Sequence, residues 1–182
     1  GYLYGNKAVL NSDGSLKEVI SGADLGSTIP SLYGTVSANV RYRRWQLFVS
    51  GDWQTGSYVH EFNRQFRFRR GLADDAVPAA AYEGSSTAAA WLNFTNLFVE
   101  KADFFKVRTI RLDYTFLSPI QAVKSLNVAF SVYNPLSFTA AKDDPEAVLS
   151  SARSQGAVAA GGINYASFSA PRQWILSLTA TF

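Results

Sequence analysis

The sequence predicts an all-β fold, an antiparallel up-and-down meander whose strands each have one apolar and one polar face. Three observations support this prediction. Side chains alternate between apolar and polar over several stretches, which is the period of a pleated strand. The connections between these stretches alternate between short and long. No run approaches the roughly 18 apolar residues of a membrane-spanning helix, so any crossing of a membrane would need strands.

The last stretch, residues 172–182, is the clearest strand. Its apolar face carries Trp174, Leu176, Leu178, Ala180 and Phe182. Gln173, Ser177, Thr179 and Thr181 lie on the other face, and only Ile175 is out of pattern. In water an exposed apolar edge strand invites aggregation, whereas lipid is a suitable phase for such a face. The stretch therefore favours a strand of a membrane β-barrel.

A second strand pair is predicted at residues 35–42 and 45–54, joined by Arg43-Arg44. A two-residue connection places Tyr42 and Trp45 side by side, so the apolar faces of the two strands coincide. Arg-Arg is poor chemistry for a type I′ turn, which prefers Asn-Gly. The paired aromatic side chains beside a charged turn fit an aromatic girdle at a membrane interface.

Two further strands are predicted at residues 104–116 and 126–133. In the first, Phe116 ends an apolar face and is a third candidate for the girdle. Lys106 and Arg108 continue that face in phase, which indicates that the strand projects beyond the hydrocarbon there. Asn134-Pro135 is expected to end the second strand, because proline has no N–H for the ladder.

The lengths of the connections predict a membrane topology. Short ones are predicted at residues 43–44 and 117–125, and long ones at 55–103 and 134–171. Residues 1–20 are ambiguous apart from a turn signal at Asn11–Gly14, and residues 21–30 are predicted as loop from their Gly and Pro. Outer-membrane barrels have short periplasmic turns and longer outer loops, so Phe182 would lie on the periplasmic side.

Five strands are too few to close a barrel, since the smallest membrane barrels have about eight. An open sheet in lipid would leave unpaired backbone groups that cost several kcal/mol each. The chain has 182 residues, no Met, and a start that lies in mid-pattern at Gly1. We therefore expect it to be a segment of a longer barrel protein whose upstream strands are not included.

Several motifs resemble those of the SusC/RagA-like TonB-dependent outer-membrane transporters. The stretch Thr95–Tyr114 contains Phe98-Val99-Glu100, then Phe105-Lys106-Val107-Arg108, then Ile110, Leu112 and Tyr114 in the family's order. Downstream, Asn134–Thr139, Asp144-Pro145-Glu146 and Pro171-Arg172 are similar to further family motifs, and upstream so are Gly26–Pro30 with Gly34. Pro135 departs from the family, which more often has Leu. The resemblance covers about Gly22 to Phe182.

The resemblance implies the last five or so strands of a 22-stranded barrel in the bacterial outer membrane. Such transporters import large nutrients, often glycans or peptides, with energy supplied through TonB. The plug, the earlier strands and the TonB-contacting segment would lie outside this chain. The expected partners are outer-membrane lipid, the TonB complex, a SusD-like lipoprotein and the barrel-assembly machinery, which would read Phe182 as its signal.

Candidate site residues follow from this topology. Arg41, Asp52, Arg111 and Asp113 lie on polar faces, where they would point to the barrel lumen or the plug. A plain ion-pair network in the lumen is the simpler interpretation of these four residues. Tyr82, Trp91 and Tyr165 in the long loops are candidates for substrate contact. The girdle candidates are Tyr42, Trp45 and Phe116.

The sequence contains no catalytic constellation, so no enzyme activity, cofactor or metal is expected. His60 is the only histidine and cysteine is absent, which excludes His-cluster and Cys-ligated metal sites. Asp143, Asp144 and Glu146 could ligate Ca²⁺, although a solvated acidic turn is the simpler interpretation. The aromatic and basic run Phe62–Phe68 fits loop packing or lipopolysaccharide contact better than nucleic-acid binding, and a net charge of +3 gives no nucleic-acid footprint.

Two other hypotheses remain open. The chain could be a complete small barrel of porin type, which would need at least three further strands from residues 1–20 and the loops. It could also be a soluble β-sandwich carbohydrate-binding module, in which the apolar faces pack together as a core. The second of these requires Val36, Leu112 and Leu176 to be buried together.

Overall fold

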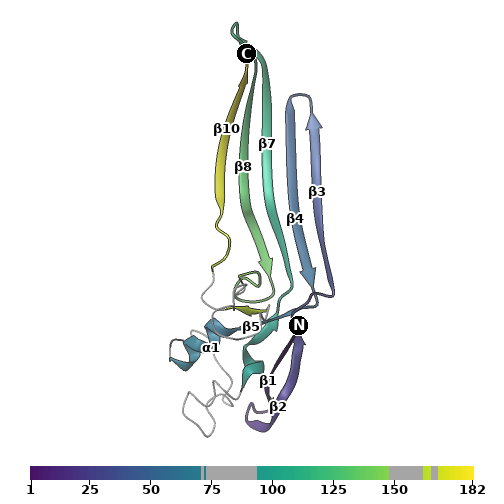
Figure 1. Ribbon diagram of the computed structural model, residues 1–182, viewed down its shortest axis with the longest axis vertical. Helices are drawn as coiled ribbons and strands as arrows, with labels where there is room; N and C mark the ends of the chain where they lie inside the picture. The colour runs from purple at the N-terminus through teal and green to yellow at the C-terminus, as the bar shows by residue number, and fades with distance from the viewer. Residues whose placement is uncertain (71, 73–93, 148–161, 165–167) are drawn as a thin grey trace. The chain divides into compact units, whose positions relative to one another are not determined.

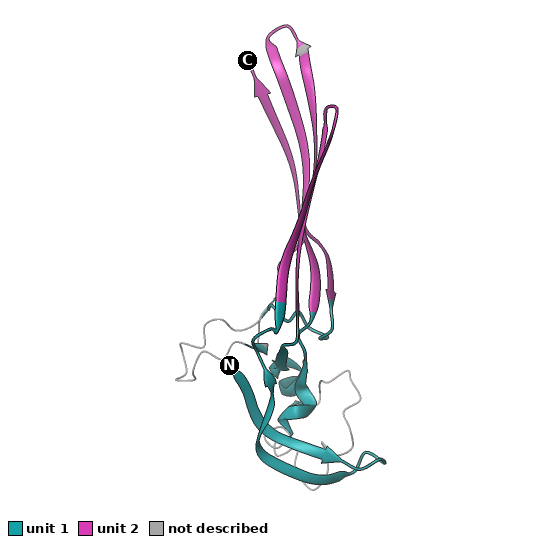
Figure 2. Ribbon diagram, turned by 90° about the vertical axis from the view of Figure 1, so that its right-hand side faces the viewer, with its two compact units in different colours: residues 1–32, 55–103, 139–169 teal, residues 33–54, 104–138, 170–182 magenta. Residues whose placement is uncertain are grey.

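The computed structural model describes residues 1–70, 72, 94–147, 162–164 and 168–182. The chain divides into two units, coloured separately in Figure 2. The sheet unit comprises Tyr33–Gln54, Phe104–Phe138 and Ala170–Phe182, and the loop unit comprises Gly1–Leu32, Thr55–Asp103 and Thr139–Ser169. No helix among the described residues is long and apolar enough to span a membrane.

The sheet unit is built on one five-stranded sheet in the order β10-β8-β7-β4-β3 (Figure 1). Its strands are β3 (Leu32–Tyr42), β4 (Trp45–Thr55), β7 (Phe104–Ile120), β8 (Val123–Thr139) and β10 (Gln173–Thr181). The pairs β4–β7 and β8–β10 are antiparallel. The strands twist along their length, as β-strands of L-residues do (Figure 2). The antiparallel meander predicted from the sequence is confirmed.

The predicted strands match the observed ones, and the two central strands are longer than predicted. The Arg43-Arg44 connection is a two-residue turn between β3 and β4. The next turn is also tight, at Gln121-Ala122, because β7 continues to Ile120 and β8 begins at Val123. The predicted nine-residue connection at 117–125 was therefore too long. Both tight turns lie at the same end of the sheet as the C-terminus (Figure 1).

The prediction that Asn134-Pro135 ends a strand was wrong. β8 continues through both residues to Thr139, with Asn134 at a positive φ of 51°. The ladder between β8 and β10 ends at the pair Tyr133–Gln173. Pro135 therefore lies beyond that ladder, and proline is tolerated on a strand edge. Asn134 Nδ2 donates to Pro171 O and the Arg172 guanidinium donates to Pro135 O, which ties this point of β8 to the start of β10.

The interpretation of Lys106 and Arg108 as part of the apolar face was also wrong. Ser50 pairs with Thr109, but Gly51 pairs with Val107, so Arg108 is an extra residue in β7. This β-bulge shifts the side-chain phase by one residue. Val107 and Phe105 lie opposite Gly51 and Trp53 in the register. Both side chains therefore lie on the apolar face. Lys106 is instead the register partner of Asp52, so its side chain lies on the polar face.

The loop unit contains short elements that the sequence did not reveal. Its elements are β1 (Tyr2–Leu10), β2 (Leu16–Ser27), β5 (Tyr58–Glu61), α1 (Phe62–Arg69), η2 (Thr95–Phe98), β6 (Val99–Lys101) and β9 (Ile163–Asn164). β1 and β2 form a two-stranded sheet, and β6-β5-β9 form another. The predicted turn at Asn11–Gly14 is confirmed, because Asn11 N donates to Ser15 O and Gly14 N donates to Asn11 O.

Residues 21–30 were predicted as loop, but β2 extends to Ser27. Gly22 and Gly26 have positive φ values of 64° and 122°, and the β1–β2 ladder has irregular register near them. The strand therefore continues through both glycines, whose positive φ values accommodate its irregular register. Gly26 also leaves room for the Tyr58 ring, with which an added Cβ would clash. Similarly, the run at residues 62–69, interpreted as loop, is the helix α1.

A small core holds the loop unit together. Its buried members are Ala8, Phe68, Phe94 and Phe98, contributed by β1, α1 and the residues around η2. Asn96 in η2 fixes the edge of β1, since its side-chain amide accepts from Ala8 N and donates to Ala8 O. A side chain thus takes both hydrogen bonds that a neighbouring strand would otherwise make.

Candidate functional site

The polar face of the sheet unit brings together two of the four predicted lumen residues as an ion pair. Arg111 Nη2 lies 2.7 Å from Asp113 Oδ1, and Arg111 Nε lies 2.9 Å from Asp113 Oδ2. The two residues are two positions apart on β7 and therefore share a face. The pair is bidentate, the geometry that fits guanidinium to carboxylate. Asp113 is buried, whereas most large apolar side chains on the opposite face of the same sheet are exposed.

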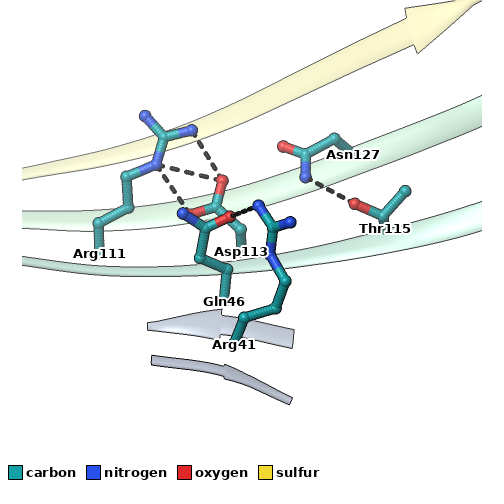
Figure 3. A network of polar contacts seen from close by, with 6 residues as sticks. All are labelled: Arg41, Gln46, Arg111, Asp113, Thr115 and Asn127. Atoms are coloured by element: carbon teal, nitrogen blue, oxygen red, sulfur yellow. Dashed lines mark hydrogen bonds and ion pairs between the residues drawn. The ribbon is translucent and has the colours of Figure 1, made fainter. Parts of the chain in front are cut away.

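The third predicted residue, Arg41, joins this face from the neighbouring hairpin. Its Nη2 donates to Gln46 Oε1 at 3.1 Å, and Gln46 is the register partner of Asp113. Figure 3 shows Arg41, Gln46, Arg111, Asp113, Thr115 and Asn127 projecting to the same side of the strands. Asn127 Nδ2 donates to Thr115 Oγ1 at 3.1 Å, which extends the network to β8. Gln46, Thr115 and Asn127 were not among the predicted site residues.

The fourth predicted residue, Asp52, lies in a second cluster on the same face. The Arg108 guanidinium forms a bidentate ion pair with the Asp52 carboxylate, with Nη2 2.8 Å from Oδ2. Lys106 is buried beside it, with its Nζ 4.9 Å from the centre of the Phe104 ring. Arg108 and Lys106 were not predicted as site residues, because the alternation of β7 placed them on the apolar face. A sequence signal was present, namely two cations in phase with apolar residues and a glycine on the adjacent strand.

Most large side chains on the apolar face of the sheet are exposed, although Val132 is buried. Val36, Leu112 and Leu176 are 54%, 40% and 66% exposed, so they are not buried together as the β-sandwich hypothesis requires. On the polar side, by contrast, Asp113 and Ser131 are buried. This distribution is the reverse of that in a water-soluble sheet, where large apolar side chains are inside. A sheet of this kind suits an apolar phase on one side and a polar interior on the other.

Two of the predicted girdle residues, Trp45 and Phe116, form an aromatic band with Tyr114 next to the β3–β4 turn. The rings of Trp45 and Tyr114 lie 4.6 Å apart between centroids, and those of Tyr114 and Phe116 also lie 4.6 Å apart. Tyr42, Trp45 and Phe116 are all exposed. Tyr114 completes the band, because the register places it directly opposite Trp45. Contacts of this length and tilt are favourable for aromatic pairs.

The remaining candidates are the three loop aromatic residues, the terminal Phe182 and the acidic turn at 143–146. Tyr82, Trp91 and Tyr165, the candidates for substrate contact, lie outside the described residues. Phe182 is exposed, and its backbone oxygen accepts a hydrogen bond from Lys124 Nζ at 2.9 Å. Of the acidic turn at 143–146, Asp144 Oδ1 accepts from Glu146 N, which is the contact of an ordinary turn. In the described ranges, no three His, Asp or Glu side chains are placed to hold a metal ion.

The Phe98-Val99-Glu100 motif lies at the centre of the loop unit. Phe98 is fully buried in the core, and its ring contacts Phe68 of α1 at 5.8 Å between centroids. Glu100 Oε1 lies 2.6 Å from Arg64 Nη1 of α1, and Glu100 Oε2 accepts from Lys142 N. One carboxylate thus joins β6, the helix and the segment after β8. The sequence identified this motif only by resemblance, and the structure assigns it a packing role.

An open pocket of about 460 Å³ lies in the loop unit beside β1 and β2. Its lining consists of Lys7, Asp24, Leu25, Gly26, Tyr58, Asn96 and Val99. The lining therefore combines an ammonium group, a carboxylate and a phenol ring with apolar surface. Such a pocket can accept a ligand that carries charge as well as an apolar part. No pocket was predicted here from the sequence, because β1, β2 and η2 are brought together only by folding.

His60 is largely buried in β5. Burial lowers the pKa of its imidazole from the ordinary value of 6.5, and a hydrogen bond of 2.6 Å between Nε2 and Gln65 Oε1 partly opposes that shift. The folded state therefore favours the neutral ring more than the unfolded chain does. This arrangement agrees with a packing role for the single histidine.

The lowered pKa predicts that the loop unit loses stability in acid. As pH falls through 6.5, the unfolded chain protonates His60 before the folded chain does, so the unfolded state is favoured until pH reaches the folded pKa. We expect amide hydrogen exchange in β5, corrected for intrinsic rates, to accelerate from about pH 7.5 to about pH 5.5. His60→Gln should remove most of this acceleration. Equal acceleration in both proteins would contradict the assignment.

Comparisons with known proteins support the fold. The sequence matches no protein-family model and no curated protein. The chain is similar in structure to the RagAB peptide importer in the open-open state, with a TM-score of 0.70, 16% identity, and coverage of 100% of this chain and 22% of that chain. It is also similar to the closed-closed state, with a TM-score of 0.62, 14% identity and coverage of 100% and 23%.

A third structure, of the RagAB peptide transporter, gives a TM-score of 0.68 at 14% identity, with the same coverage of 100% and 23%. The chain therefore spans less than a quarter of the length of the chains it matches. At these identities the likeness establishes the fold only. The likeness extends over the whole chain, and so includes both the sheet unit and the loop unit.

Proposed function

We propose that this chain forms the closing strands of a TonB-dependent outer-membrane importer of large nutrients. The observation that carries the proposal is the reversed distribution of side chains in the sheet unit. Large apolar residues are exposed on one face, and ion pairs are gathered on the other. Lipid would contact the first face, and the barrel lumen or plug the second. The motifs of the SusC/RagA-like transporters and the fold likeness to RagAB support the same assignment.

Closure of the sheet requires more strands than the five described. Within the described part of the chain, β3 and β10 are the edges of the sheet, each with a ladder partner on one side only. In lipid, each unpaired backbone group on those edges would cost several kcal/mol. We infer that β3 and β10 pair with other strands of a 22-stranded barrel that encloses a plug. TonB would act through that part of the protein.

In this barrel the tight turns of the sheet face the periplasm, and the long connections leave from the outer end of the strands. Arg41, Asp52, Arg111 and Asp113, together with Lys106 and Arg108, would line the lumen. Phe182 would serve as the signal for the barrel-assembly machinery. The imported nutrient would be a peptide or a glycan, delivered with a SusD-like lipoprotein. The segment would act without catalysis, metal or cofactor.

The hypothesis of a complete small barrel is less well supported. It needs β1 and β2 to extend the five-stranded sheet. Instead, these strands pair with each other in a separate two-stranded sheet. No other strand in the described part of the chain joins the five-stranded sheet. The importer proposal does not depend on additional strands from this chain.

The proposal predicts which side chains meet hydrocarbon. Spin labels at Val36, Leu112 and Leu176 of the outer-membrane protein should show access to oxygen and little access to a water-soluble quencher. Labels at the adjacent positions Ser37 and Ser177 should show the opposite preference, because neighbouring strand residues face opposite sides. The measurement is collisional quenching by electron paramagnetic resonance in bilayers. Equal accessibility of the two sets would contradict the membrane assignment.

A further inference from the structure

The turn between β3 and β4 carries two arginines with exposed side chains, Arg43 and Arg44. Neither guanidinium makes a hydrogen bond or an ion pair with any residue that the structure describes. The neighbouring Arg41 is different, because it faces the polar side and donates to Gln46. The turn therefore presents two unpaired positive charges at the end of the apolar face.

The backbone at Arg43 is unfavourable for arginine. Its φ is +54°, in the left-handed region that glycine and asparagine adopt most easily. Two-residue hairpin turns normally place those residues there. Arginine at this position destabilises the turn relative to asparagine, so the turn chemistry does not account for it. Such an outlier is a reason to look for a functional role.

The Arg43 guanidinium is already positioned by an aromatic side chain. Its Cζ lies 5.3 Å from the centre of the Tyr42 ring, within the range of a cation–π contact. Tyr42 and Trp45 flank the turn, and Trp45 contacts Tyr114. Aromatic side chains of this kind mark the level of lipid headgroups in membrane barrels. The charges therefore lie just beyond the hydrocarbon, at the level of the phosphate groups.

We propose that Arg43 and Arg44 bind the phosphate of anionic phospholipids in the periplasmic leaflet. This inference rests on the proposed function, which places the tight turns on the periplasmic side. Guanidinium matches phosphate through paired N–H donors, and basic residues beside a membrane attract anionic lipid. We assign the phosphate to a phospholipid because the short turns face the inner leaflet, whereas lipopolysaccharide would contact the loop side.

The test compares lipid retention by the intact outer-membrane protein in nanodiscs. Discs would contain phosphatidylcholine with phosphatidylglycerol, and native mass spectrometry would count the lipids that remain bound. The wild-type protein should retain phosphatidylglycerol preferentially. Each arginine replaced by glutamine should lower that preference about fivefold, and high salt should lower it in the wild type. Lys17→Gln removes an exposed charge from β2 and should leave the preference unchanged.

Two further variants separate binding from turn stability. Arg43→Asn should keep or raise the thermal stability of the protein in phosphatidylcholine, because asparagine suits the positive φ, and should still lower phosphatidylglycerol retention. Arg43→Lys should retain part of the preference, since it keeps the charge and loses the paired donors. An equal loss of retention in Arg43→Asn and Lys17→Gln would overturn the proposal.

Other outcomes would also overturn it. Unchanged retention in the double Arg43→Gln, Arg44→Gln variant would remove the turn from lipid binding. A different result is that lipid A displaces phosphatidylglycerol from the wild type and fails to bind the double variant. That pair of results would assign the phosphate to the other leaflet. A spin label at Leu112 in the same discs tests the membrane placement independently. If that label reports hydrocarbon while retention is unchanged, only the lipid site fails and the importer proposal stands.

Discussion

Replacing Gly51 with valine is expected to prevent most of the protein from reaching its assembled state in the outer membrane. Gly51 lies at the bulge between β4 and β7, and a Cβ built on it would lie 2.7 Å from the Lys106 carbonyl oxygen. Backbone cannot move aside as a flexible side chain can. Overpacking of this kind costs about 1–3 kcal/mol by itself.

The larger effect comes from loss of the bulge. In a regular ladder, the phase of β7 would shift by one residue, and Lys106 and Arg108 would emerge on the apolar face. A cation on the lipid face of a barrel costs about 1–4 kcal/mol depending on depth. Arg108 would also leave Asp52 without its ion-pair partner. The valine can therefore be accommodated in two ways, by straining the bulge or by losing it. Both destabilise the sheet.

The measurement is the fraction of protein that shows heat-modifiable mobility in isolated outer membranes. Gly51→Ala should give an intermediate loss, because the first added carbon already makes the close contact. Ser50→Val is the control, since it places the same side chain one residue earlier, at the pair Ser50–Thr109 that precedes the register shift. Assembly of Gly51→Val at the wild-type level would show that the bulge does not set the phase of β7.

The five strands of the sheet could be predicted because their two faces differ in chemistry. A period of two that separates apolar from polar side chains is visible over as few as eight residues, as in residues 35–42. The pairing of Tyr42 with Trp45 followed from the length of the turn alone. The register between β8 and β10 confirms the same logic, since Trp174, Leu176 and Leu178 oppose Val132, Phe130 and Val128.

The errors in the sheet have one physical origin, which is that a strand can continue where its period is interrupted. At Arg108 an extra residue changes the phase, and at Asn134 a positive φ and a following proline look like an end. The same effect occurs in β2 of the loop unit, where Gly22 and Gly26 were taken for loop signals and lie in the strand. At Asn134-Pro135 the interruption is tied to the start of β10 by hydrogen bonds with Pro171 and Arg172, which a single sequence does not display.

The loop unit was poorly predicted for a different reason. Its elements are short, and contacts between distant segments hold them in place. Asn96 contacts Ala8, 88 residues away in sequence, and Arg64 contacts Glu100 across 36 residues. Short helices and strands are marginal without such packing, so local propensity carries little information about them. The sequence pointed to this region through a turn signal at Asn11–Gly14 and through family-like motifs such as Phe98-Val99-Glu100, and neither shows which segments meet.

The second large effect is expected from Glu100→Ala, which removes two contacts of the loop unit at once. Arg64 loses a carboxylate at 2.6 Å, and the Lys142 N–H loses its acceptor. Breaking a fully buried pair costs about 3–5 kcal/mol, because one charge stays behind without compensation. Here the two side chains are 20% and 18% exposed, so water compensates in part and we expect about 2–4 kcal/mol.

Hydrogen exchange in α1 and β6 should report this loss as local opening. A change of about 2–4 kcal/mol corresponds to exchange roughly 30-fold faster or more, while peptides from β4 and β7 should be unaffected. Glu18→Ala, which removes an exposed carboxylate from β2, serves as the control and should leave all rates unchanged. The double variant Arg64→Ala, Glu100→Ala should lose less than the sum of the single losses, because no uncompensated charge remains. If instead Glu100→Ala left exchange in α1 unchanged, the carboxylate would not be what joins the helix to β6, and the motif would owe its place in the loop unit to Phe98 alone.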